Sequence, residues 1–249
     1  MDIFDLTADQ LWKPLSLLGF EHSFFTINGH IVIQTWIILL ILFGTLLFIR
    51  YFLQYKQSIP YFLTTTFVHS FIDLTNQTLG SFFFNHLAFI CSLFTFILIC
   101  NIASTFPWLK EPTSDLNTTL ALGIISFLYI QWHAIQTHGL WSYIISYFSP
   151  IFFLFPLNLM GKLSNIISIS FRLFGNIFGG SVIGAMYQGI IKGSVIWETI
   201  GLLSGLNFII LLFFSLFEGF LQAFVFSILS LTYLSIAIQK EGPPKEPKK

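Results

Sequence analysis

Two apolar stretches near the C-terminus constrain this chain more than any other feature. Residues 151–191 carry only Lys162 and Arg172 as charged side chains, and residues 199–238 carry only Glu218. As a helix, each would extend ~60 Å, about twice the ~30 Å hydrocarbon core of a bilayer. An average tilt of ~20° does not absorb that excess. Each stretch is therefore a re-entrant pair of short helices or one long oblique helix. Because no proline or polar cluster interrupts the second stretch, we favour long oblique helices.

The composition excludes a soluble fold. Only 9% of the 249 residues are charged and 55% are hydrophobic, whereas a soluble domain has about 25% charged residues. Eleven basic and eleven acidic residues cancel, so the positive charge expected of a nucleic-acid-binding protein is absent. The sequence has no zinc-like cysteine spacing and no phosphate-binding loop. We therefore expect an integral membrane protein that binds the lipid bilayer and needs no metal or cofactor, and any nucleotide chemistry would take place on another chain.

The pattern of apolar runs predicts one all-α membrane domain over residues 1–249. Five membrane helices are expected, at residues 31–52, 87–109, 116–134, 151–191 and 199–238. Residues 60–80 mix Phe with Thr, His, Ser and Asp, which is typical of an amphipathic helix on the membrane surface. Residues 1–29 would form an outer N-terminal segment, and residues 240–249 a disordered tail.

Five spans place the two ends of the chain on opposite sides of the membrane. Arg50, Lys56 and the lysines of the tail would share one side, and Lys13, Lys110 and Lys192 the other. The positive-inside rule then places the C-terminus in the cytoplasm.

Arg172 is the residue that is most costly to place in a membrane. A mid-membrane Arg costs about 2.5–3.5 kcal/mol on insertion scales, and its guanidinium does not release its proton. It can act only as a fixed positive charge that attracts a carboxylate or repels a cation. Polar and small residues at helical spacing form one stripe in each long apolar stretch. The first stripe contains Asn165, Ser168, Arg172, Asn176 and Gly179. The second contains Ser204, Asn207, Ser215, Glu218 and Gln222.

Structural explanations compete with a functional one for these residues. Arg172 and Glu218 could form an ion pair that locks two helices together. The GxxxG patterns at Gly175 and Gly180 are typical of helix packing. The six histidines lie near predicted span ends, where an interfacial location explains them without a metal. A self-contained secondary ion transporter that uses an Arg–Glu pair is the alternative function.

The segment Ser168-Ile-Ser-Phe-Arg172-Leu-Phe-Gly-Asn176 resembles the signature of the a subunit of F-type ATP synthases in its bacterial and chloroplast form. Further similar segments extend the resemblance over nearly the whole chain: GHIVIQTW at 29–36, SDLNTTL at 114–120, PLN at 156–158 and LQAFVF at 221–226.

The resemblance implies a subunit that translocates protons through two offset half-channels at the interface with a ring of c subunits. Flow through it would couple the proton gradient to ring rotation and ATP synthesis. The implied partners are the c-ring, the b-subunit peripheral stalk and the remainder of the complex. The implied location is the bacterial inner membrane, with a thylakoid or other organelle membrane as the alternative. The choice between H⁺ and Na⁺ stays open.

The resemblance also implies roles for individual residues. Arg172 would favour the ionised form of a passing ring carboxylate. Asn176, Gln222 and Ser168 would position Arg172 or line the path, and Asn101, Asp115 and Asn117 would belong to the outer access route. The chain departs from the family pattern where titratable residues are usual, at Ser181, Ser215, Gly161 and Ser104. Glu218, one turn before Gln222, is the expected replacement relay acid.

Overall fold

The computed structural model describes most of the chain as helix. The described residues are 11–12, 27–56, 58–103, 105, 109, 111–148, 152–191, 205, 209 and 212–239. Its long helices are α1 (Gly29–Phe52), α2 (Ile59–Leu79), α3 (Phe84–Ala103), α4 (Leu116–His138), α6 (Phe155–Ile191) and α9 (Gly219–Ile238). Its shorter elements are α5 (Leu140–Ser146), η4 (Pro112–Ser114), η5 (Phe152–Leu154), the π-helical η6 (Phe213–Glu218) and the paired two-residue strands β1 (Leu11–Trp12) and β2 (Ile27–Asn28).

The predicted all-α membrane fold is confirmed. Within the described part of the chain, five helical segments are long and apolar enough to cross a membrane: Ile31–Phe52, Phe84–Ala103, Leu116–His138, Phe155–Tyr187 and Phe213–Ile238. Outside them, α2 begins after Ser58, whose side chain caps the backbone N–H of Tyr61, and it ends at Gly80 with a φ of 69°. The sequence indicated neither the small β1–β2 ladder nor the short helix α5.

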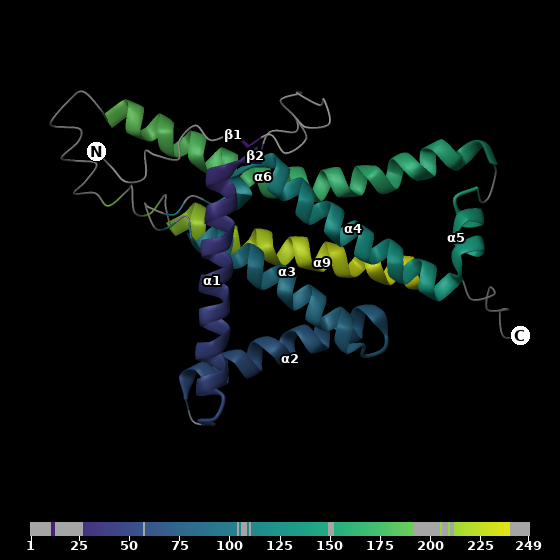
Figure 1. Cartoon of the computed structure of the whole chain (residues 1–249), viewed down its shortest axis with the longest axis horizontal. Coiled ribbons are helices and arrows are strands. Elements are labelled where there is room, and N and C mark those ends of the chain that lie inside the picture. The colour runs from purple at the N-terminus through teal and green to yellow at the C-terminus, as the bar shows by residue number, and fades with distance from the viewer. Residues whose placement is uncertain are drawn as a thin grey trace, which may run out of the picture.

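Helices α6 and α9, from the two long apolar stretches, lie across α1. In Figure 1, α1 stands upright, α2 crosses its C-terminal end, and α6 and α9 run lengthwise through the molecule. Since α6 is one continuous helix of 37 residues, it extends ~55 Å and must pass obliquely through a ~30 Å core. The alternative of a re-entrant helix pair is therefore excluded for α6. The counterpart at 199–238 is described as a helix only from residue 212.

Several element ends differ from the predicted bounds. Helix α3 ends at Ala103, short of Leu109, and Thr105 lies in a turn whose amide bonds the carbonyl of Ile102. In the sequence, Pro107 stands four residues after Ala103; a proline has no N–H to bond the carbonyl four residues earlier, and its ring clashes with that carbonyl. Helix α4 continues past residue 134 to His138 because no breaker occurs before Gly139, whose φ is 80°.

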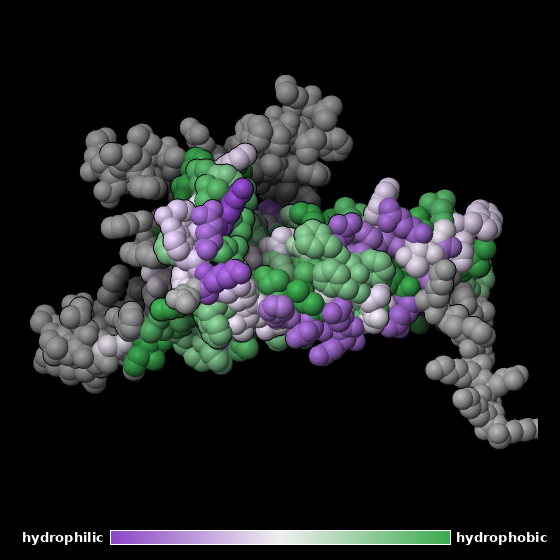
Figure 2. All heavy atoms as spheres, turned by 90° about the horizontal axis from the view of Figure 1, so that it is seen from below, coloured by the Kyte–Doolittle hydropathy of each residue, from purple (hydrophilic) through white to green (hydrophobic). Residues whose placement is uncertain are grey.

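A tight seam joins α4 to α6 and α9. A Cβ atom added to Gly123 of α4 would lie 2.2 Å from Ser170 Oγ of α6. One turn further along α4, buried Ser126 donates a hydrogen bond of 2.8 Å to Ser230 of α9. Outside the seam, large apolar side chains are exposed on every spanning helix, and Figure 2 shows them over much of one face. Such a surface suits contact with lipid and with other membrane subunits.

The seam predicts the effect of Gly123→Ala. The added methyl group overpacks the contact with Ser170, so we expect a loss of about 1–3 kcal/mol in stability, measured by thermal unfolding of the purified protein in detergent. Ser170→Ala in the same chain should restore most of the loss because it removes the opposing hydroxyl. Gly161→Ala is the matched control, since a Cβ there meets nothing within 4 Å. Equal stability of Gly123→Ala and wild type would contradict this packing.

Candidate functional site

Arg172 lies on the open side of α6. Its side chain and that of Ser168 are exposed, whereas Ile169, Ser170 and Leu173, which lie about 60° to 160° around the helix from Arg172, are 6%, 0% and 0% exposed. The buried side packs against α4 and α9. The packing of α6 therefore turns the guanidinium away from the rest of this chain.

Small residues flank Arg172 on the open side. A Cβ atom added to Gly161, Gly175 or Gly179 would meet nothing within 4 Å. Helix positions seven, eleven or fourteen residues apart share one face, so this open strip runs along α6 above and below the Arg. Small side chains allow another helix to approach closely. The strip therefore has the shape of a docking surface for a helix outside this chain.

Gly180 has a different role from its neighbour Gly179. A Cβ atom at Gly180 would lie 3.1 Å from the ring of Phe214 in η6. The glycine thus admits the aromatic ring and holds the C-terminal half of α6 against η6. Of the four glycines in the two GxxxG patterns, Gly180 packs inside the chain, whereas a Cβ atom at Gly175, Gly179 or Gly184 would meet nothing within 4 Å.

The described part of the second polar stripe lies on η6 and α9, whereas its members Ser204 and Asn207 lie outside the described residues. Ser215 is 9% exposed, Gln222 is 6% exposed, and Glu218 between them is half-buried. Ser215 and Glu218 belong to the π-helical turn, a feature often found at functional sites because it re-aims side chains. Glu218 ends this turn, one residue before α9 begins.

Asn101 of α3 clamps the junction beside Glu218. Its Nδ2 donates a hydrogen bond of 2.9 Å to the carbonyl of Gly219. A Cβ atom at Gly219 would approach Asn101 Cβ to 2.7 Å, so only a glycine permits this contact. The sequence singled out Asn101 but not Gly219, because nothing near Gly219 in the sequence indicates its distant partner.

Arg172 and Glu218 do not form the ion pair that was one structural explanation of both. Neither side chain makes an ion pair or hydrogen bond to another residue that the structure describes. A locked pair between α6 and η6 is thus not formed, and neither is the pair that a self-contained transporter would use.

The other candidate residues lie at the start of α4 and along α6. Asp115 caps α4 by accepting a hydrogen bond of 2.8 Å from the backbone N–H of exposed Asn117. Ser181 is exposed and donates to the carbonyl of Phe178 within its own helix. Asn176 is half-buried. Within the described ranges, no three His, Cys, Asp or Glu side chains converge as a metal site would require.

Comparisons with known proteins agree with these features. The model of the ATP synthase A chain family matches residues 32–235. ATP synthase subunit a of Moorella thermoacetica is 31% identical over 204 residues, which cover 82% of this chain and 88% of that protein. A sodium-ion-specific ATP synthase subunit a from Propionigenium modestum is 31% identical over 226 residues, covering 83% and 73%. ATP synthase subunit a of Albidiferax ferrireducens is 26% identical over 94% of this chain and 97% of its own length.

The family match spans the open strip of α6, the π-helical turn and the Asn101 clamp, and the relatives cover most of the chain. The resemblance found in the sequence is confirmed: the chain belongs to the ATP synthase A chain family, the a subunits that contribute to the membrane ion channel of rotary F-type complexes.

Proposed function

We propose that this chain translocates protons through two half-channels that meet beside Arg172, at its interface with the c-ring. Flow through them drives ring rotation and thereby ATP synthesis, while the chemistry of ATP takes place on other subunits. The observation that carries the proposal is the cation on the open, glycine-lined strip of α6. A ring helix that docks on this strip brings its carboxylate to the guanidinium.

The guanidinium acts on the carboxylate as it passes. A positive charge within ~4–6 Å lowers the pKa of a carboxyl by ~1–3 units, so the proton leaves into the adjoining half-channel. Arg172 stays charged throughout because its own proton is not released at accessible pH. The same fixed charge repels a proton that would otherwise cross directly between the half-channels.

The outer half-channel follows the polar side chains of α3, η6 and α9. Glu218 relays the proton, with buried Ser215 and Gln222 on either side of it and Asn101 fixing the backbone at Gly219. Ser181 lines the path from α6. Asp115 and Asn117, at the start of α4, lie at its mouth. On α6, Ser168 and Asn176 line the path one turn before and one turn after Arg172.

The charge distribution supports one orientation in the membrane. With the C-terminus in the cytoplasm, the basic residues after α1 and in the tail share the inner side. We place the protein in a bacterial inner membrane, with the b-subunit peripheral stalk as a further partner. A thylakoid or other organelle membrane is the alternative.

Arg172→Ala tests the central role directly. We expect ATP-driven proton pumping and ATP synthesis to be abolished, since no other described spanning segment supplies a mid-membrane cation. Pumping is measured by quenching of a pH-sensitive dye in inverted vesicles, and co-purification of the c-ring shows that the complex has assembled. Retained pumping by the variant in an assembled complex would refute the proposal.

The coupling ion is tested in the same vesicles. Dye quenching without ²²Na⁺ uptake is the expected result for a proton channel. ATP-driven ²²Na⁺ uptake without quenching would contradict the choice of ion and leave the role of Arg172 standing.

Glu218→Gln tests the relay. Because an amide does not exchange protons as a carboxyl does, we expect proton flux to fall about 100-fold, within the range typical of a lost acid–base group. Asp73→Asn is the matched control, since Asp73 is exposed on α2, away from the path. Equal fluxes in the two variants would show that Glu218 is only structural.

A further inference from the structure

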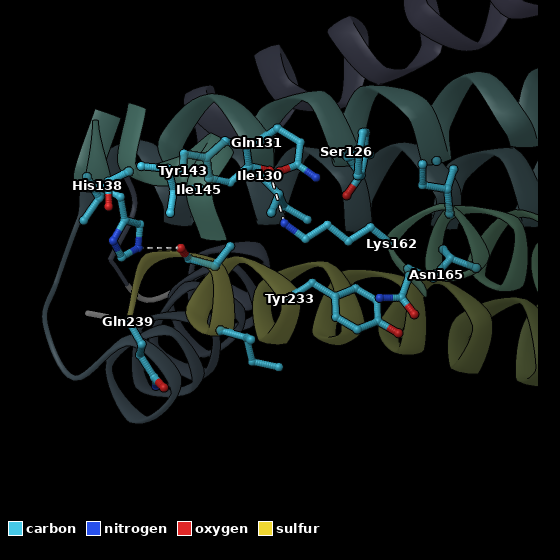
Figure 3. Close-up of a pocket in the computed structure, with 18 residues that line it drawn as sticks. Ser126, Ile130, Gln131, His138, Tyr143, Ile145, Lys162, Asn165, Tyr233 and Gln239 are labelled. Atoms are coloured by element: carbon cyan, nitrogen blue, oxygen red, sulfur yellow. Dashed lines mark hydrogen bonds between the residues drawn. The ribbon is translucent and has the colours of Figure 1, made fainter. Parts of the chain in front are cut away.

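A second polar region lies between the last turns of α4 and α9 and the first turns of α6. A cavity of about 1040 Å³ opens there between α4, α5, α6 and α9. Figure 3 shows Lys162 extending into it from α6, opposite Gln131 of α4 and near Tyr233 of α9. None of the residues assigned to the ion path lines this cavity.

The lining is rich in hydrogen-bond donors and lacks acids. Lys162, Asn165, Gln131, Ser142 and Tyr143 all contribute to it, and no Asp or Glu does so within the described ranges. His138 closes one side by donating a hydrogen bond of 3.0 Å to the carbonyl of Ala237. A cavity of this composition favours an anion over a cation.

Lys162 is held in place without being neutralised. Its Nζ lies 3.8 Å from the ring centroid of Tyr147 and 4.8 Å from that of Tyr143, and it donates a hydrogen bond of 3.3 Å to the Tyr143 hydroxyl. These contacts orient the ammonium group and leave its charge intact. An ammonium has three donors, and one of them is used by Tyr143.

Tyr143 contributes a neutral hydroxyl that contacts both Lys162 and Gln131. Burial, together with its hydrogen bond to Tyr147, raises the pKa of Tyr143 well above its usual range. The phenol therefore stays protonated and places no negative charge beside Lys162. Its hydroxyl donates to Oε1 of Gln131, which occupies the amide oxygen and leaves the amide N–H groups available to a ligand.

We propose that this cavity binds a phosphate-bearing anion, with Lys162 as the charged contact and the amides of Gln131 and Asn165 as further donors. The site lies where α4 and α9 end and α6 begins, the level at which lipid head groups meet spanning helices. Ile130, Ile145, Ile166 and Ile236 supply apolar walls that suit the glycerol and upper acyl region of an acidic phospholipid. Free phosphate shares the recognised chemistry and is the second source.

Binding of lipid to the purified intact complex in neutral detergent tests the site. The probes are fluorescent phosphatidylglycerol, fluorescent phosphatidylcholine and inorganic phosphate as competitor. We expect wild type to prefer phosphatidylglycerol and Lys162→Gln to lose about tenfold in affinity for it, as one charge-assisted hydrogen bond is lost. Lys56→Gln, at an exposed lysine after α1, should bind as wild type does.

Ser142 provides a second pair of variants that leaves Lys162 intact. Ser142 is exposed on α5 and lines the cavity, so its substitution should not disturb folding. Ser142→Asp adds a negative charge and should weaken binding, whereas Ser142→Asn should not.

The results distinguish a lipid from free phosphate as the bound anion, and they show whether the cavity binds an anion at all. If wild type prefers phosphatidylglycerol and phosphate does not displace this lipid, the cavity is a lipid site. If phosphate displaces the lipid, the cavity is a site for free anions. Equal binding of both lipids with no binding of phosphate would overturn the proposal. Unchanged affinity in Lys162→Gln and Ser142→Asp would do so as well. Because the readout is binding, it is independent of ion flux.

Discussion

The structure depends on one constraint: a guanidinium that is always charged has to lie on a helix that crosses lipid. Isolated in a hydrocarbon core, such a group costs several kcal/mol. Helix α6 meets this constraint by burying one side against α4 and α9 and leaving Arg172 on its exposed side. In the function we propose, a helix of the c-ring docks on this exposed side.

Glycines decide which surfaces of α6 close and which stay open. Gly123 of α4 and Gly180 of α6 remove side chains where helices of this chain touch, whereas Gly175 and Gly179 remove them where no part of the described chain approaches. On α9, Gly219 lets Asn101 reach the backbone next to Glu218. Rigid packing on one side thus positions the polar side chains on the other, which is what a path for ions between a fixed and a moving subunit requires.

Much of this fold could be predicted from the sequence because hydropathy and the thickness of the bilayer act locally. The five spans, the oblique α6 and the polar stripe of Arg172 follow from runs and spacings of residues. The end of α3 at Ala103 was harder to place, because the effect of Pro107 reaches back along the helix. The π-helical turn at Glu218, the Asn101–Gly219 contact and the cavity of Lys162 could not be predicted, because each depends on segments that meet only after folding.

Disulfide cross-linking in the assembled complex tests most directly which face of α6 meets the rotor. A cysteine at Gly175, on the face of Arg172, is compared with one at Gly184, which is equally open but lies about 120° around the helix from Arg172. Each is paired with a cysteine next to the carboxylate of the ring subunit, in a background without Cys91 and Cys100. The account predicts rapid cross-linking from Gly175→Cys and little from Gly184→Cys. Cross-linking from Gly184→Cys alone would contradict it.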